Sequence, residues 1–89
     1  MKYLYFSAPW CGPCRMLGPT MEKVKEEGIT IDKVNIDEET SQNLVAEYAI
    51  RNIPTVILVD ESGKEFARTV GAKPLNHYIE QYKNFTEDV

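Results

Sequence analysis

Hydrophobic and polar positions alternate along the chain in blocks that predict four strands and three helices. Strands are expected at residues 2–7, 29–37, 55–60 and 65–70, where short β-prone, alternating or apolar runs occur. Helices are expected from Cys11, across residues 40–49 and from Pro74, because apolar residues recur there at spacings of three and four. The predicted order is therefore β-α-β-α-β-β-α.

Residues with known end preferences mark the helix boundaries. Gly28 tolerates a left-handed conformation and is expected to end the first helix. Thr40 or Ser41 can cap the second helix, and Pro74 suits the first position of the third. The final TEDV is expected to fray. The predicted apolar stripes are Cys14, Leu17, Met21 and Val24 in the first helix and Leu75, Tyr78, Ile79 and Tyr82 in the third. The second helix is expected to run through Leu44, Tyr48 and Ala49.

The order of these elements predicts an α/β fold. A strand–helix–strand start gives a parallel pair through a right-handed crossover, and a hairpin turn at Gly63 adds an antiparallel edge. The result is a mixed four-stranded sheet with helices on both faces. The strand at 55–60 is apolar in its middle and is expected to be central.

Composition and charge restrict the function classes. Residues 1–89, with 43% hydrophobic and 27% charged residues, are expected to form a single domain. A net charge of −4 argues against nucleic-acid binding, because there is no basic surplus to neutralise phosphates. We find no apolar run long enough for a bilayer and no secretory signal, so we expect a cytoplasmic monomer in a reducing compartment.

Both cysteines of the chain lie in the segment APWCGPCRM, residues 8–16. Cys11 is predicted at the helix N-terminus, where unpaired N–H groups favour a thiolate, so we expect an accessible nucleophile. Cys14 lies one turn deeper on the apolar stripe and is expected to be buried, which suits a resolving thiol. Gly12 leaves the approach to Cys11 open, and Pro13 holds the two sulfurs close.

Structural roles for this pair are less favoured. A disulfide that closes so short a loop constrains the unfolded chain very little. A zinc site needs four ligands, whereas the chain offers two cysteines and one histidine, and we predict no metal. That histidine, His77, falls opposite the stripe of the last helix and is expected to be a solvated surface residue. The pair is therefore interpreted as redox-active.

Several segments together resemble the thioredoxin family. WCGPC looks like its active-site signature, and KVNID (33–37), IRNIPT (50–55) and VGA (70–72) follow in the family's order and approximate spacing. Pro19 resembles the proline that kinks the active-site helix. The likeness covers nearly the whole chain and implies a thioredoxin fold.

The resemblance also implies roles for residues that spacing alone does not identify. Pro54 corresponds to a cis-proline beside the cysteines, where the backbone pairs with the substrate chain. A shallow apolar surface that receives a substrate disulfide corresponds to Trp10, Ile53, Gly71 and Ala72. The alternatives are that Ile53 belongs only to the core and that Gly71 serves only a bend.

Taken with the resemblance, the site predicts a protein-disulfide reductase. Cys11 attacks a partner's disulfide, Cys14 then attacks Cys11, and the two electrons end on the pair without a bound cofactor. The resemblance implies a lowered thiol pKa, a reducing potential, and a thioredoxin reductase drawing on NADPH, or another donor, as the source of electrons.

The sequence departs from the family at two places. Typical thioredoxins begin with an additional strand and helix, and this chain is closer in size to glutaredoxins. The family usually buries an aspartate six residues before the first cysteine, with a lysine that Lys33 matches; here the position is Tyr5, a poor base near neutral pH. Water or the departing thiolate then becomes the candidate proton acceptor for Cys14.

Three other functions stay open. A glutaredoxin-like enzyme would take electrons from glutathione, but the usual aromatic residue between the cysteines is absent. An oxidase or isomerase would share the fold, although Gly12 and Pro13 resemble the reducing branch. A redox-gated binding module would dock one partner on its apolar surface and would keep binding after both cysteines become serine.

Overall fold

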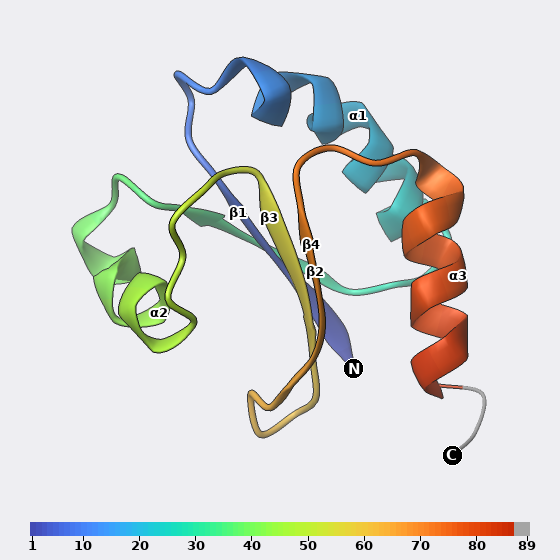
Figure 1. Cartoon of the computed structure of the whole chain (residues 1–89). Helices are drawn as coiled ribbons and strands as arrows, with labels where there is room; N and C mark the ends of the chain where they lie inside the picture. The colour runs from blue at the N-terminus through green and yellow to red at the C-terminus, as the bar shows by residue number, and fades with distance from the viewer. Residues whose placement is uncertain (87–89) are drawn as a thin grey trace.

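The computed structural model describes residues 1–86, in which one sheet separates two layers of helices (Figure 1). Helices α1 and α3 cover one face of the sheet and α2 lies on the other. The elements are β1 Lys2–Ser7, α1 Gly12–Glu26, β2 Ile31–Asn35, the 3₁₀ turn η1 Glu39–Ser41, α2 Gln42–Glu47, β3 Thr55–Val59, β4 Glu65–Val70 and α3 Leu75–Thr86.

The strand order is β2-β1-β3-β4, which confirms the predicted mixed sheet. β1 pairs in parallel with β2, and β3 is antiparallel to both β1 and β4. The two inner strands, β1 and β3, are the most buried ones, because both of their faces are covered. The C-terminal end of β1 leads through residues 8–11 into α1, so the cysteines lie at that edge of the sheet (Figure 1).

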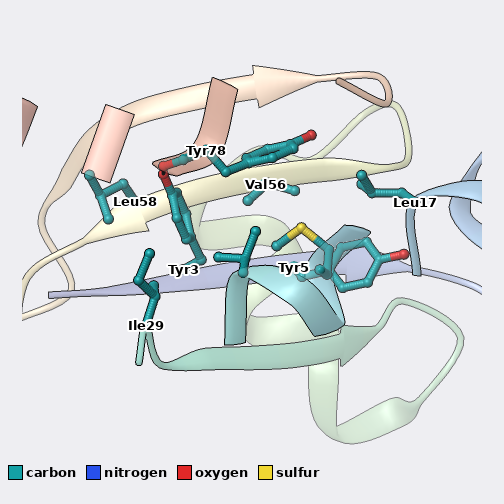
Figure 2. Close-up of a cluster of buried hydrophobic side chains, with 9 residues drawn as sticks. Tyr3, Tyr5, Leu17, Ile29, Val56, Leu58 and Tyr78 are labelled. Atoms are coloured by element: carbon teal, nitrogen blue, oxygen red, sulfur yellow. Dashed lines mark hydrogen bonds between the residues drawn. The ribbon is translucent and has the colours of Figure 1, made fainter. Parts of the chain in front are cut away.

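The larger core lies between the sheet and helices α1 and α3. Figure 2 shows Tyr3, Tyr5, Val56 and Leu58 from the sheet facing side chains of the two helices. The Tyr3 hydroxyl donates a hydrogen bond of 2.8 Å to the backbone oxygen of Tyr78, so this buried phenol is satisfied. The predicted α1 stripe is buried in full: Cys14, Leu17, Met21 and Val24.

A second core lies between the sheet and α2. Phe6 and Ile57 are fully buried there, and the Tyr48 ring lies 6.2 Å from the Phe6 ring. Leu44 packs against the same cluster. Helices therefore cover both faces of the sheet, as predicted.

The structure corrects several predicted boundaries. The second strand is confined to 31–35, because its partner β1 supplies only residues 3–7 to the ladder. Ser41 occupies the N-cap position of α2 but makes no side-chain capping bond, and α2 ends at Glu47. α3 begins at Leu75, immediately after Pro74.

The C-terminal expectation is tested only in part. Thr86 is the last residue of α3, and its hydroxyl donates to the Tyr82 carbonyl at 2.7 Å. The remaining EDV of the predicted frayed end lies outside the described residues.

Candidate active site

The two cysteines form a disulfide at the start of α1. Cys11 is the N-cap residue, with φ −85° and ψ 114°, and its sulfur accepts the backbone N–H of Cys14 at 3.2 Å. This contact satisfies one of the free N–H groups at the helix end. The same N–H and the helix dipole stabilise negative charge on the Cys11 sulfur once the disulfide is reduced.

The expectation that Cys11 is accessible is wrong for this oxidised state. Only 5% of Cys11 is exposed, compared with 4% of Cys14. The disulfide turns the Cys11 sulfur toward Cys14, and Ile36 and Ile53 pack against the pair from other segments. Exposure therefore does not distinguish the two cysteines here. Position along the helix distinguishes the two cysteines, because Cys11 occupies the N-cap and Cys14 lies within the helix.

The segment before β3 brings its backbone to the disulfide. The Cys11 sulfur lies 3.9 Å from the Ile53 carbonyl oxygen, and the Ile53–Pro54 peptide bond is cis, as the resemblance implied. The backbone N–H of Gly71 donates to the Pro54 carbonyl at 2.9 Å. Gly71 adopts φ +89°, which favours glycine at this turn. These contacts bring Gly71 next to Pro54, with Ala72 exposed immediately after it.

Trp10 stands at the rim of the site with 64% of its surface exposed. Its indole Nε1–H donates to the Asp37 carboxylate at 2.6 Å, which ties it to the loop after β2. Asn35 in turn accepts the backbone N–H of Asp37 at 2.9 Å. Asp37 was missed as a site residue, although it lies within the KVNID segment that carries part of the resemblance. No local pattern connects it with Trp10, 27 residues away.

Tyr5 lies below Cys14 on β1. Its hydroxyl donates to the Cys14 carbonyl at 2.8 Å, and burial raises the pKa of this tyrosine, an effect that a hydrogen bond with Ser7 partly offsets. Lys33 is its partner across the β1–β2 ladder and is exposed. The Tyr5 hydroxyl therefore bonds to the backbone of α1, while Lys33 is exposed to solvent.

The remaining residues named in the sequence analysis lie on or near helices α1 and α3. Gly12 and Pro13 are exposed in the first turn of α1, and Pro19 lies inside this helix. His77 is half-buried and hydrogen-bonds Thr69 at 2.8 Å. The expectation that it is a solvated surface residue is therefore wrong. The reason is that His77, in the first turn of α3, lies within hydrogen-bond distance of the Thr69 hydroxyl near the end of β4.

Two negative findings apply to residues 1–86. No group of three or more His, Cys, Asp or Glu side chains in this range is arranged to hold a metal ion. Within the same range, no helix combines the length and the apolar character needed to cross a membrane.

Comparisons with known proteins agree on one family. The family model described as Thioredoxin matches residues 2–84. A thioredoxin from Porphyra purpurea is 40% identical over 84 residues, covering 83% of this chain and 76% of that protein. A chloroplastic M-type thioredoxin from Chlamydomonas reinhardtii is 40% identical over 85 residues, covering 89% and 59%. The solved structure of a mutant thioredoxin from Halobacterium salinarum superimposes with a TM-score of 0.84 at 30% identity, covering 94% and 73%.

Proposed function

This chain belongs to the thioredoxin family, and we propose that Cys11 is its attacking sulfur and Cys14 its resolving sulfur. The protein is a thiol-disulfide oxidoreductase that reduces protein disulfides through this pair, and thioredoxins need no bound cofactor for the exchange. The observation that carries the assignment is the N-cap contact, in which the Cys11 sulfur accepts the Cys14 N–H at 3.2 Å.

The proposed reaction has two exchange steps. The Cys11 thiolate attacks one sulfur of a partner's disulfide, forming a mixed disulfide and releasing the partner's other sulfur as a thiolate. Cys14 then loses its proton and attacks the Cys11 sulfur, and the partner's second sulfur departs. The partner gains two electrons, and the protein is left with the Cys11–Cys14 disulfide, which is the oxidised form described above.

The surface that receives the partner is proposed to surround Cys11. Trp10 and Ala72 are exposed there, Ile53 is half-buried against the cysteines, and Gly71 is bonded to the backbone of Pro54. A shallow apolar rim beside exposed backbone suits an extended segment that carries a disulfide. Ile53 also packs against the α2-side core, so it joins this surface to the fold.

The electron donor is proposed to be a thioredoxin reductase that uses NADPH. Turnover of insulin disulfides with NADPH and thioredoxin reductase is expected to exceed turnover with NADPH, glutathione and glutathione reductase by at least about tenfold. Absorbance of NADPH at 340 nm measures both reactions in parallel, with the Cys11→Ser variant as the control for background reduction. Equal or faster turnover with glutathione would instead assign the chain a glutaredoxin-like donor.

Cys11 is expected to be alkylated before Cys14 in the reduced protein. The N-cap favours its thiolate, which is the form that reacts with iodoacetamide, whereas the Cys14 side chain lies on the buried stripe of α1. Brief labelling at neutral pH followed by peptide mass spectrometry measures the order. Preferential labelling of Cys14 would reverse the assigned roles.

The remaining expectations concern context. The chain is proposed to act as a single-domain monomer in a reducing compartment such as the cytoplasm, where the pair is regenerated after each turnover. One relative reported above, the M-type thioredoxin from Chlamydomonas reinhardtii, is chloroplastic.

A further inference from the structure

Met16 is the most exposed large hydrophobic side chain among the described residues, with 78% of its surface open to solvent. It lies in α1, four residues after Gly12 and three after Pro13, so these three residues share the exposed side of the helix. The buried stripe of α1, which includes Cys14, lies on the other side. The thioether of Met16 is therefore solvated, one turn beyond the exposed start of the helix.

Two further exposed apolar side chains lie at the same site. Trp10, 64% exposed, precedes Cys11 directly, and Val70, 51% exposed, precedes Gly71 in the turn after β4. This turn and the start of α1 lie at the same edge of the sheet (Figure 1). Exposed apolar side chains that gather in this way mark an interaction surface rather than chance exposure. Met16 therefore extends the proposed partner surface along α1.

The five sulfur-bearing residues differ sharply in their access to solvent. The chain has two cysteines and three methionines, all within the part that the structure describes. In the oxidised form, Cys11 and Cys14 are joined in the disulfide and carry no thiol. Met21 is 4% exposed, and Met1 is half-buried against the same core. Of the five, only Met16 is exposed, so it is the sulfur most open to a dissolved oxidant.

We propose that Met16 is a sulfoxidation site through which hydroperoxides weaken the binding of partner proteins. The inference rests on the reductase function proposed above, because the surface concerned is the one that receives the partner's disulfide. With hydrogen peroxide, the thioether sulfur forms a bond to one peroxide oxygen and the O–O bond breaks. The sulfur loses two electrons and becomes a sulfoxide, and the peroxide is reduced to water.

Oxidation changes the contact that Met16 offers to a partner. A thioether is flexible and polarizable, and it adapts to an apolar surface. A sulfoxide is polar, and its oxygen has to give up hydrogen bonds to water when a partner covers it. The two cysteines are unchanged by this reaction. The loss is therefore expected in reactions with protein disulfides and not in the exchange chemistry itself.

The first test locates the modification. Protein in the disulfide form is treated with hydrogen peroxide at neutral pH, and fragment-ion mass spectrometry follows each methionine over time. Met16 is expected to gain oxygen at least about tenfold faster than Met21, with Met1 between them. Equal rates at Met16 and Met21 would overturn the assignment of this site.

The second test measures the effect on partners. Treated protein is reduced with dithiothreitol, which leaves sulfoxides in place, and freed of the reagent. Its oxidation by insulin and by hydroxyethyl disulfide is then followed by Trp10 fluorescence. The rate constant with insulin is expected to fall about threefold, whereas the rate with hydroxyethyl disulfide, which is too small to cover Met16 while it reacts at Cys11, is expected to stay unchanged.

Two variants of Met16 separate this effect from general damage. Met16→Leu keeps an apolar side chain without the sulfur, so its rate with insulin is expected to be equal before and after peroxide. Met16→Gln places a polar group there and is expected to show the lowered rate without any treatment. An unchanged rate with insulin in the treated wild type would overturn the proposal, as would an equal loss in treated Met16→Leu. Untreated protein that reacts with neither disulfide would instead contradict the proposed reductase function.

Discussion

Replacing Cys14 with serine is expected to abolish turnover and to accumulate partner proteins as mixed disulfides on Cys11. Serine removes the resolving sulfur but keeps the backbone N–H that contacts the Cys11 sulfur at 3.2 Å. The nucleophile therefore stays activated at the helix N-cap, while nothing displaces the bound partner. Non-reducing electrophoresis of the purified variant, followed by mass spectrometry of the captured bands, measures the accumulation.

Cys11→Ser is the matched control and is expected to capture no partner. Its remaining sulfur belongs to Cys14, which is 4% exposed and lies on the buried stripe of α1. Equal capture by both variants would contradict the stepwise mechanism. A third variant with both cysteines changed to serine separates binding from catalysis, because undiminished binding of the same proteins would favour a docking module.

The fold was largely predictable because its apolar pattern is local. Spacings of three and four residues along α1 identify its buried side, and the turn at Gly63 fixes the hairpin between β3 and β4. The strand predicted at 65–70 has the observed bounds. The predicted β2 was too long, because the number of paired residues is set by β1, which lies far away in the sequence.

The candidate site was predicted less completely than the fold. The positions of Cys11 and Cys14 followed from the motif, but the burial of Cys11 depends on Ile53, 42 residues further along the chain. The contact between Trp10 and Asp37 likewise joins two loops that meet only after the sheet has formed. Such contacts depend on tertiary packing, which a pattern of neighbouring residues does not encode.

The hydrogen bond between Tyr5 and Cys14 illustrates the same limit. The sequence shows a tyrosine where the family usually has an aspartate, and this raises the question of the proton acceptor. Only the structure shows that the hydroxyl is already engaged with the Cys14 carbonyl. For this reason, Tyr5→Phe is expected to cost about 1 kcal/mol of stability and to change the resolution rate only slightly.

Tyr5→Asp is expected to cause the largest loss of stability among these variants. Tyr5 is 4% exposed, and its ring belongs to the core of β1, β3, α1 and α3 (Figure 2). Truncating a buried aromatic ring costs about 3–5 kcal/mol, and burying a carboxylate adds to this. Tyr5→Asn has nearly the same shape without the charge, so the difference between the two variants isolates the ionised group.

The pH dependence of that difference has a defined sign. Burial raises the folded-state pKa of the new carboxyl above its unfolded value of about 3.9, so both variants are equally stable below about pH 4. As the pH rises, the free energy of unfolding of the Asp variant falls by about 1.4 kcal/mol for each pH unit between the unfolded and the folded pKa of this carboxyl. An ion pair with Lys33 would make this loss smaller. Urea unfolding of both variants from pH 3 to 8 measures this.

The same pair of variants tests the chemistry of the resolving step. A carboxylate at residue 5 is placed beside Cys14 and is able to accept its proton, so Tyr5→Asp is expected to add a titration to the resolution rate that Tyr5→Asn lacks. The rate is measured against pH by following Trp10 fluorescence after the reduced protein is mixed with an excess of a disulfide peptide, under conditions in which both variants are folded. Identical profiles for Asp and Asn, together with equal stability at pH 8, would mean that the carboxylate is solvated and takes no part in the proton transfer.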